Sequence, residues 1–538
     1  MIQASFRALA VSCTALALAS CTPTTQSDVA DAAPVQRTCE SLAGVALPNA
    51  TITEVAALTQ GQSQPIDAFG IPPLPTAAAY CRVNATLTPR EGSSIRVEVW
   101  LPAREAWNGK FVANGNGGYG GGLGGPRLTM RPALHRGYVA AASDMGHQGD
   151  GASGEDASWA LNNPIAIEDY GYRANHEMTQ FARALIREYY GEGPRRSYFQ
   201  GCSDGGREAL MEAQRYPDDF DGIIAGAPAN AWPGLMASMM WTNHVAHIDA
   251  ATRIPDDKLA LIQNAVMAQC DELDGVADGV LEDPRRCNFN PASLQCRGRD
   301  RADCLTAPQI GALRALYQGP RDPQTGAQIF PGYPVGGEAT PNAWPLWLTG
   351  ENAQHIGFPR SFFRNFVFNE PNWDPASFDF SRDPQIGDRL MGDIVGSDNP
   401  DLSAFNASGG KLILYHGWND AAITPLATIQ YYDAVRETLG GDAADAFTRL
   451  YMVPGMSHCL GGPGVNSFDM LSVLDAWVER GEAPQRVVAA RYEPEYLGVL
   501  DLPAQPVRTR PICPYPQTAH YNGSGDTDDA ANFTCRAP

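Results

Sequence analysis

A glycine-rich turn, Gly201-Cys202-Ser203-Asp204-Gly205-Gly206, restricts the fold of this chain. It follows a strand-like run, residues 196–200, and precedes a helix-like run, residues 208–213. In a G-x-S-x-G turn between a strand and a helix, the glycines permit a sharp bend that exposes the serine hydroxyl above a sheet. The turn therefore predicts a nucleophile elbow at Ser203. The alternative is an ordinary turn, because the chain has 54 glycines among 538 residues.

Strand-like and helix-like runs alternate on both sides of this turn, as in a parallel sheet covered by helices. The pattern predicts an α/β protein with an α/β-hydrolase core, built from residues 37–229 and 407–538. Between residues 230 and 406, prolines, aromatics, four cysteines and an acidic loop replace the alternation, which predicts an inserted lid domain. The expected strands are 94–101, 110–113, 138–142, 220–228, 411–417 and 448–453, with a long helix over 166–190 and an irregular tail after 503.

Two loops after the elbow carry residues that complete a catalytic triad. In an α/β-hydrolase the acid and then the base follow the nucleophile, each in a loop after a strand. Asp420 and His458 occupy such loops, in that order. We expect His458 to take the proton of Ser203 during attack, and Asp420 to orient the imidazole and stabilise its charged form.

Other residues compete for these roles. Asp144 also follows a predicted strand, but it precedes Ser203 and so breaks the expected order. His416 lies inside a strand and is interpreted as packed beside the site rather than as the base. The remaining competing histidines are His135, His147 and His176.

A glycine cluster at residues 114–122 follows the strand-like run 110–113. In an α/β-hydrolase this position supplies the second oxyanion donor. We expect the tetrahedral oxygen to bind the backbone N–H of Asp204 and that of Gly117 or Gly118. A flexible surface loop is the alternative, whereas a phosphate-binding P-loop is excluded because no G-x-x-x-x-G-K-[ST] pattern occurs.

The N-terminus resembles an export signal, with Arg7 followed by an apolar run. Residues 1–20 are the predicted signal peptide, and residues 21–36 a tether to the folded part. Small residues before Cys21 fit a lipid attachment site, which predicts a periplasmic or outer-membrane lipoprotein; cleavage and secretion are the alternative. Apart from a lipid anchor we expect no membrane contact, because no later run has the ~20 apolar residues that a span needs.

The charge balance argues against one class of partner. The chain has 39 basic and 60 acidic residues, a net charge of −21. Nucleic-acid binding requires clustered Lys and Arg, and we find no such cluster. The sequence leaves the oligomeric state open.

Ten cysteines remain after Cys13 and Cys21 are set aside, an even number that predicts disulfides in an exported chain. A bond between Cys202 and Cys459 would tie the nucleophile to the base, because disulfides need Cα atoms roughly 4.4–6.8 Å apart. Proximity in sequence favours the pairs Cys270–Cys287, Cys296–Cys304 and Cys513–Cys535, and leaves Cys39 and Cys81 unassigned.

The pattern Cys202-Ser203, Asp420 and His458-Cys459 resembles the signature of the tannase and feruloyl esterase family, and the resemblance runs from about Cys39 to the C-terminus. It implies an α/β-hydrolase with a lid that hydrolyses esters of aromatic acids such as gallate or ferulate through an acyl-enzyme. Synthetic aromatic monoesters such as mono(2-hydroxyethyl) terephthalate are the alternative substrates. A peptidase or acyltransferase on the same fold is the nearer alternative among enzymes. A non-catalytic lipoprotein that binds polyphenols or carbohydrates is the more distant alternative.

An acidic loop in the predicted lid has carboxylates at three- and four-residue spacing, Asp271, Asp274 and Asp278, with glycines between them. Such oxygen ligands suit Ca²⁺, although the pattern is not an EF-hand. A solvated acidic turn is the alternative. The family resemblance implies a structural Ca²⁺ held by these three carboxylates and by the carbonyls of Val276 and Val280.

Aromatic residues of the lid could line an acyl pocket, although most are expected to form the lid core. Arg364 is a candidate partner for a substrate carboxylate, and Ile423 a candidate pocket residue. The lid aromatics are Trp232, Trp241, Trp344, Trp347, Phe362, Phe363, Phe366 and Trp373.

Overall fold

The structure is a computed structural model that describes residues 37–538, apart from 65–72, 77, 150–153, 500–501 and 538. The predicted signal peptide, Cys21 and the tether lie outside the described residues. Within the described ranges, no helix combines the length and the apolar character needed to cross a bilayer.

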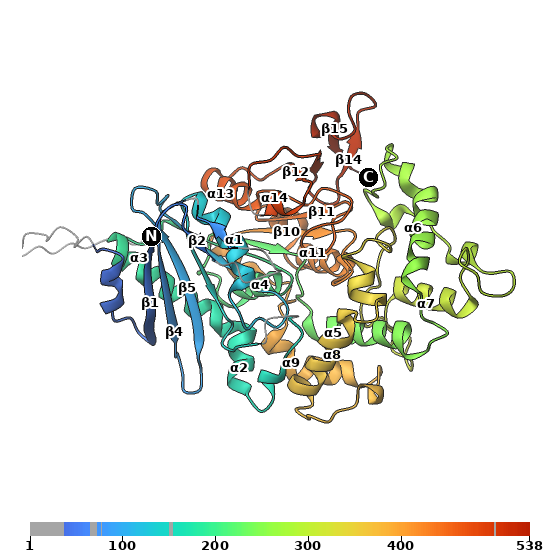
Figure 1. Cartoon of the computed structure of the whole chain (residues 1–538), viewed down its shortest axis with the longest axis horizontal. Helices are drawn as coiled ribbons and strands as arrows, with labels where there is room; N and C mark the ends of the chain where they lie inside the picture. Colours follow the sequence, from blue (N-terminus) through green and yellow to red (C-terminus); the bar gives the residue numbers. More distant parts are fainter. Residues whose placement is uncertain (1–36, 65–72, 77, 150–153, 500–501, 538) are drawn as a thin grey trace, which may run out of the picture. The chain divides into compact units, whose positions relative to one another are not determined.

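Nine strands of the described chain form one mixed sheet in the order β1-β4-β5-β7-β6-β8-β9-β10-β11. The strands from β7 through β11 in this order are parallel, and β1, β4 and β5 form an antiparallel extension (Figure 1). The bounds are β1 Ala50–Leu58, β4 Tyr80–Leu87, β5 Ile95–Pro102, β6 Lys110–Asn114, β7 Val139–Ser143, β8 Arg196–Cys202, β9 Gly222–Gly226, β10 Lys411–Gly417 and β11 Thr448–Val453.

The register of the parallel strands brings three loops to one edge of the sheet. Cys202 at the end of β8 and Tyr415 near the end of β10 both pair with Gly226 of β9. Gly417 of β10 in turn pairs with Val453, the last residue of β11. Ligand and catalytic sites of open α/β sheets lie at this carboxyl edge, so the elbow and the two later loops emerge close together.

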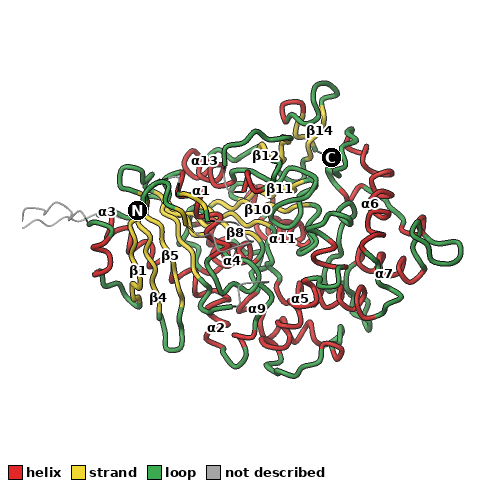
Figure 2. The backbone as a smooth tube through the Cα atoms, viewed as in Figure 1, coloured by secondary structure: helices red, strands yellow, loops and turns green. Residues whose placement is uncertain are grey.

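Alternation along the strands places apolar side chains on both faces of the sheet. Phe199 packs in one buried cluster and its neighbour Tyr198 in another. Helices then cover both faces (Figure 2). The first cluster includes side chains of α3 (Ala174–Tyr190) and α4 (Asp204–Arg215), and the second those of α1 (Gly124–His135) and α13 (Met470–Arg480).

The long helix expected over residues 166–190 contains a π-helical turn near its start. A short helix, α2 (Pro164–Glu168), is followed by a π-helical turn at Asp169–Arg173 and only then by α3. The wide turn carries Tyr170, whose buried hydroxyl donates to the Asp204 carboxylate at 2.9 Å. The predicted helix over residues 166–190 is confirmed, with the π-helical turn as an irregularity inside it, and it ends at Gly191, which has φ of 82°.

A largely helical segment separates β9 from β10, although these strands are neighbours in the sheet. It has its own apolar cluster, which includes Leu259, Leu313 and Trp344. Figure 1 shows α6 and α7, drawn in green, on the opposite side of the view from β1 and β4. The division into a core and a lid domain at residues 230 and 406 stays a prediction. The helices are α5 (Trp232–Asn243), α6 (Asp256–Cys270), α7 (Ala307–Gln318), α8 (Gly357–Ser361), α9 (Asp383–Val395) and α10 (Ser403–Ala407).

The C-terminal tail is more regular than its prolines suggest. The expectation of an irregular tail after residue 503 was wrong, because backbone pairing joins β13 to β12 and β14 to β15. The remaining elements are β2 (Ser63–Gln64), β3 (Leu74–Pro75), α11 (Pro425–Leu439), α12 (Gly441–Asp445), β12 (Val487–Arg491), α14 (Tyr496–Val499), β13 (Arg508–Ile512), β14 (Thr518–Tyr521) and β15 (Phe533–Arg536).

Disulfides join all ten cysteines of the described ranges. The bond between Cys202 and Cys459 is confirmed, with Cα atoms 6.0 Å apart. The three pairs of sequence neighbours are also confirmed. The two cysteines left unassigned, Cys39 and Cys81, pair with each other and tie the start of the described chain to β4.

Candidate active site

Ser203 stands on a strained turn between β8 and α4. Its backbone has φ of 67° and ψ of −123°, a conformation that residues other than glycine rarely adopt. The turn is anchored to the neighbouring strand β9, because the Ser203 N–H donates to the Gly226 carbonyl at 3.0 Å. Strain of this kind is a property of the nucleophile elbow, in which it lifts the serine hydroxyl above the sheet edge.

Three glycines of the turn are required by close backbone contacts. A Cβ atom on Gly201 would lie 2.3 Å from the carbonyl oxygen of Gly205. On Gly206 it would lie 2.3 Å from the Gly226 oxygen, and on Gly205 2.8 Å from the Asn116 oxygen. Since real Cβ atoms do not approach backbone this closely, any larger residue would displace the turn. This explains the glycine pattern on which the sequence prediction depended.

The structure brings Ser203, Asp420 and His458 together. His458 Nε2 lies 2.8 Å from Ser203 Oγ, and its Nδ1 lies 2.7 Å from Asp420 Oδ2. A carboxylate only accepts hydrogen bonds, so Nδ1 carries the proton and Nε2 is free to accept the serine proton. The geometry is therefore that of a nucleophile, a base and an orienting acid.

Asp420 is buried, with 2% of its surface exposed, and both of its carboxylate oxygens accept hydrogen bonds. Oδ1 accepts the backbone N–H groups of Ala422 and Ile423 at 2.8 and 2.9 Å. Burial by itself raises the pKa of the carboxyl, but the adjacent His458 and His416 outweigh it and hold the pKa well below its usual range. Asp420 is therefore an anion at neutral pH.

Two of the competing residues, His416 and Asp144, lie where they cannot replace the triad members. His416 is buried in β10, as expected, and its Nε2 lies 3.1 Å from Asp420 Oδ2. Asp144 is paired with Arg96 on β5, with 2.7 Å between Nε and Oδ2. The acid that reaches His458 is thus Asp420.

The expected oxyanion donors lie on two segments that touch each other. Asp204 is the first residue of α4, and an amide at this position has no partner within the helix. The Gly205 N–H donates to the Asn116 carbonyl at 2.9 Å, which holds the glycine cluster against the elbow. Gly118 has φ of 59°, and a Cβ on Gly117 would meet no atom within 4 Å. Which of these two glycines supplies the second donor stays a prediction.

A buried polar network beneath the elbow was not foreseen from the sequence. The Arg207 guanidinium, fully buried, donates to the Asp204 carboxylate and to the Tyr170 carbonyl. The Glu208 carboxylate accepts the Asn116 N–H at 3.1 Å and so anchors the glycine cluster to α4. The available signal was the cluster of charged residues in the first turns of a helix that packs on a sheet.

The lid aromatics form mainly core, as expected, but one of them borders the triad. The Trp347 ring meets the His458 ring edge-on, with centroids 5.2 Å apart, and its indole N–H is buried without a partner in the structure. Arg364 donates to the Trp373 carbonyl at 3.4 Å. The Ile423 side chain is buried, and its backbone contacts Asp420. Substrate contacts of Arg364 and Ile423 stay predictions.

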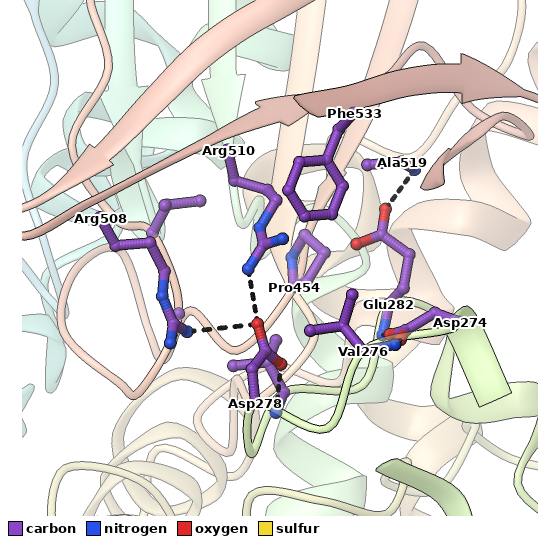
Figure 3. Close-up of a pocket in the computed structure, with 12 residues that line it drawn as sticks. Asp274, Val276, Asp278, Glu282, Pro454, Arg508, Arg510, Ala519 and Phe533 are labelled. Carbon is purple, nitrogen blue, oxygen red and sulfur yellow. Dashed lines mark hydrogen bonds and ion pairs between the residues drawn. The ribbon is translucent and has the colours of Figure 1, made fainter. Parts of the chain in front are cut away.

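The acidic loop borders a cavity closed by the C-terminal strands (Figure 3). Burial raises the pKa of Asp274 to about 6 and that of Glu282 to about 8. Asp278 points toward the tail, where its Oδ2 lies 2.5 Å from Arg510 and 3.5 Å from Arg508. The loop therefore gathers half-buried acidic groups, and one of them, Asp278, is paired with arginines.

In the described part of the chain, no three His, Cys, Asp or Glu side chains converge as a metal cluster. The Asp271 carboxylate accepts the Gly279 N–H at 3.0 Å, and Asp274 accepts the Val276 N–H at 3.0 Å. The donor types nevertheless suit a hard cation, because several carboxylates and backbone carbonyls lie within one short loop.

Comparisons with known proteins agree with this geometry. The family model described as tannase and feruloyl esterase matches residues 81–536. An uncharacterized esterase of Xanthomonas campestris is 39% identical over 92% of this chain and 91% of its own. Mono(2-hydroxyethyl) terephthalate hydrolase of Piscinibacter sakaiensis is 36% identical over 91% and 89%.

A solved structure gives the same result for the fold. Feruloyl esterase B of Aspergillus oryzae superposes with a TM-score of 0.83 at 28% identity, covering 93% of this chain and 99% of its own. The α/β-hydrolase fold predicted from the elbow is thereby confirmed. The chain belongs to the tannase and feruloyl esterase family, and it is a carboxylic ester hydrolase.

Proposed function

We propose that this protein is an exported serine esterase that cleaves esters of hydroxy-aromatic acids through an acyl-enzyme. The observation that carries the proposal is the chain of contacts from Asp420 through His458 to Ser203, with 2.7 and 2.8 Å between the linked atoms. A protein that only binds its ligand would not need an acid, a base and a nucleophile joined by hydrogen bonds in this order.

In the proposed reaction, Ser203 Oγ attacks the ester carbonyl carbon while His458 Nε2 takes the serine proton. The carbonyl oxygen becomes an anion, which the N–H of Asp204 and a glycine-cluster N–H would stabilise by roughly 3 kcal/mol per donor. His458 then returns the proton to the departing alcohol. Water, activated by the same base, releases the acid from Ser203.

The aromatic acyl group is proposed from the family and from Trp347. Relatives carry the names feruloyl esterase B and mono(2-hydroxyethyl) terephthalate hydrolase, which refer to esters of aromatic acids. Trp347 offers a flat face beside His458, and aromatic rings pack favourably on such a surface. A terephthalate monoester is the second candidate substrate, because of the identity to the hydrolase of that name.

A substrate panel on matched variants tests this function. Wild-type protein should hydrolyse at least one of the gallate, ferulate, hydroxybenzoate and terephthalate monoesters, and Ser203→Ala should lose activity without a change in melting temperature. Ser472→Ala, which alters an exposed serine of α13, is the control and should retain full activity. Hydrolysis by Ser203→Ala at the wild-type rate would refute the serine mechanism. Product analysis with added alcohols distinguishes hydrolysis from acyl transfer.

We also propose a structural Ca²⁺ in the acidic loop, held by Asp271, Asp274, Asp278 and the carbonyls of Val276 and Val280. The half-buried carboxylates beside the cavity support it, since a divalent cation would offset their mutual repulsion. Asp278 would have to exchange its Arg510 partner for the ion.

Calcium at 100 times its Kd would stabilise the fold by about 2.7 kcal/mol. The melting temperature should therefore rise with calcium and fall with chelator, and Asp271→Asn combined with Asp274→Asn should abolish this dependence. If neither calcium nor chelator changes the melting temperature of the wild-type protein, the proposed calcium site is refuted.

Export is proposed from the N-terminal signal and is supported by the five disulfides of the described chain, because such bonds persist in oxidising compartments. Fractionation of cells that express the full chain, with mass analysis of Cys21, would separate a lipoprotein from a released enzyme. Full-length protein in the cytoplasmic fraction would contradict both alternatives.

A further inference from the structure

A second histidine contacts the same carboxylate oxygen of the triad acid as His458 does. His416 lies in β10 and is fully buried. Its Nε2 lies 3.1 Å from Asp420 Oδ2 and 3.0 Å from the Ile423 carbonyl oxygen. Both of these atoms only accept hydrogen bonds, so Nε2 must carry a proton and donate it to them.

The other ring nitrogen of His416 is also occupied. Nδ1 lies 2.7 Å from the hydroxyl of Thr428, which belongs to α11. The hydroxyl can donate to Nδ1 of a neutral ring or accept from a charged one. In either state Nε2 keeps its proton, and the ring is fixed at both ends.

With this contact, four donors surround the Asp420 carboxylate. The N–H groups of Ala422 and Ile423 bind Oδ1. His458 and His416 bind Oδ2. An ionised carboxylate has about four acceptor sites, so each site is filled and the group has one orientation.

We propose that His416 is a positioning residue that holds Asp420 Oδ2 toward His458 by donating its Nε2 proton. The inference rests on the proposed serine mechanism. Removing the donor has two consequences: the carboxylate gains freedom to turn away from His458, and its less stabilised charge attracts the protonated His458 more strongly. The first lowers kcat, and the second favours the imidazolium form of His458 over the neutral base.

Other ionisable groups face Asp420 and must be considered in any pH profile. His355 is buried on the inserted segment, where burial lowers its pKa to about 3. Burial also holds the pKa of Tyr333 far above its usual range. Neither group changes charge between pH 5 and 9, so neither contributes to a shift of the acidic limb in that range.

Two substitutions at position 416 separate a donor from a mere space-filling ring. His416→Gln places an amide nitrogen near the former Nε2, whereas His416→Asn places it near the former Nδ1. We expect His416→Asn to lower kcat by about tenfold with little change in KM, because a carboxylate of Asp420 that can rotate no longer holds His458 in line with Ser203. Its acidic limb of kcat/KM should move to higher pH. His416→Gln should recover most of the activity.

Equal losses in the Gln and Asn variants, or an unchanged pH profile in a folded Asn variant, would overturn the proposal. Thr428→Val provides the test if both variants at position 416 fail to fold. It keeps His416 but removes the hydroxyl partner, and it should lower kcat with KM preserved; wild-type kcat would refute the role.

Ser203→Ala, measured in parallel, separates the two hypotheses. If that variant is active, the serine mechanism fails. If it is inactive and His416→Asn behaves as wild type, only the positioning role fails.

Discussion

Replacing Asp420 by asparagine should change the proton arrangement of the site rather than its shape. Oδ1 of Asp420 accepts two backbone N–H groups, from Ala422 and Ile423. An amide NH₂ cannot accept them, so the amide oxygen of the new side chain must take this place. The NH₂ then points toward His458 Nδ1, where the carboxylate oxygen now lies 2.7 Å away.

The consequence for His458 can be worked out from these contacts. Facing a donor, Nδ1 must accept, and the imidazole proton moves to Nε2, which faces Ser203 at 2.8 Å. The ring can then no longer take the serine proton. In serine hydrolases a wrong tautomer of this kind costs about 10⁴ in kcat, or about 5.4 kcal/mol. The NH₂ also meets the Nε2 proton of His416, which adds a repulsion between two donors.

The assay is steady-state hydrolysis of the best ester from the substrate panel, at saturating and limiting concentrations. We expect Asp420→Asn to lose kcat by about 10⁴ with KM changed by less than about threefold. Melting curves check the fold, and Asp401→Asn, at an exposed aspartate, is the matched control. A kcat for Asp420→Asn within tenfold of wild type would refute the proposed role of the acid.

Two further predictions concern the disulfide beside the triad and a buried acid of α4. The double variant Cys202→Ser with Cys459→Ser should lower the free energy of unfolding by about 2–5 kcal/mol and reduce kcat. The control pair, Cys296→Ser with Cys304→Ser, is distant from the triad residues in the chain and should leave kcat unchanged. Equal effects of the two double variants on kcat would contradict a role of the Cys202–Cys459 bond in positioning the triad. Burial raises the pKa of Glu212 well above normal. The unfolded chain releases the Glu212 proton above about pH 4.3 while the folded protein keeps it, so the folded protein loses stability as pH rises above this value. Glu212→Gln should therefore melt higher at pH 8 but not at pH 4, and a pH-independent difference would refute the reasoning.

The elbow and the triad could be predicted because their signals are local or ordered along the chain. Gly201, Gly205 and Gly206 mark a turn that tolerates no side chain, and the order of Ser203, Asp420 and His458 follows from strand connectivity. The disulfide next to the site followed from the same positions, since Cys202 and Cys459 flank the nucleophile and the base.

The parts that were missed depend on contacts distant in sequence. The π-helical turn carries Tyr170, whose hydroxyl donates to the carboxylate of Asp204, a residue 34 positions later in the chain. The acceptor role of Glu208 toward Asn116 spans 92 residues. No local propensity encodes such contacts. The strand β4, by contrast, has an alternating pattern in the sequence that would have predicted it.

The sheet order has a consequence for how activity arises during folding. The base follows β11, the edge strand of the described sheet, and its contact with the nucleophile joins residues 255 positions apart. Pairings of such long range form late, because the loop they close must first lose its entropy. We therefore expect a partly folded chain to lack the contact between Ser203 and His458. Ester hydrolysis would then begin only after β11 has joined the sheet, and the onset of turnover during refolding would report that step.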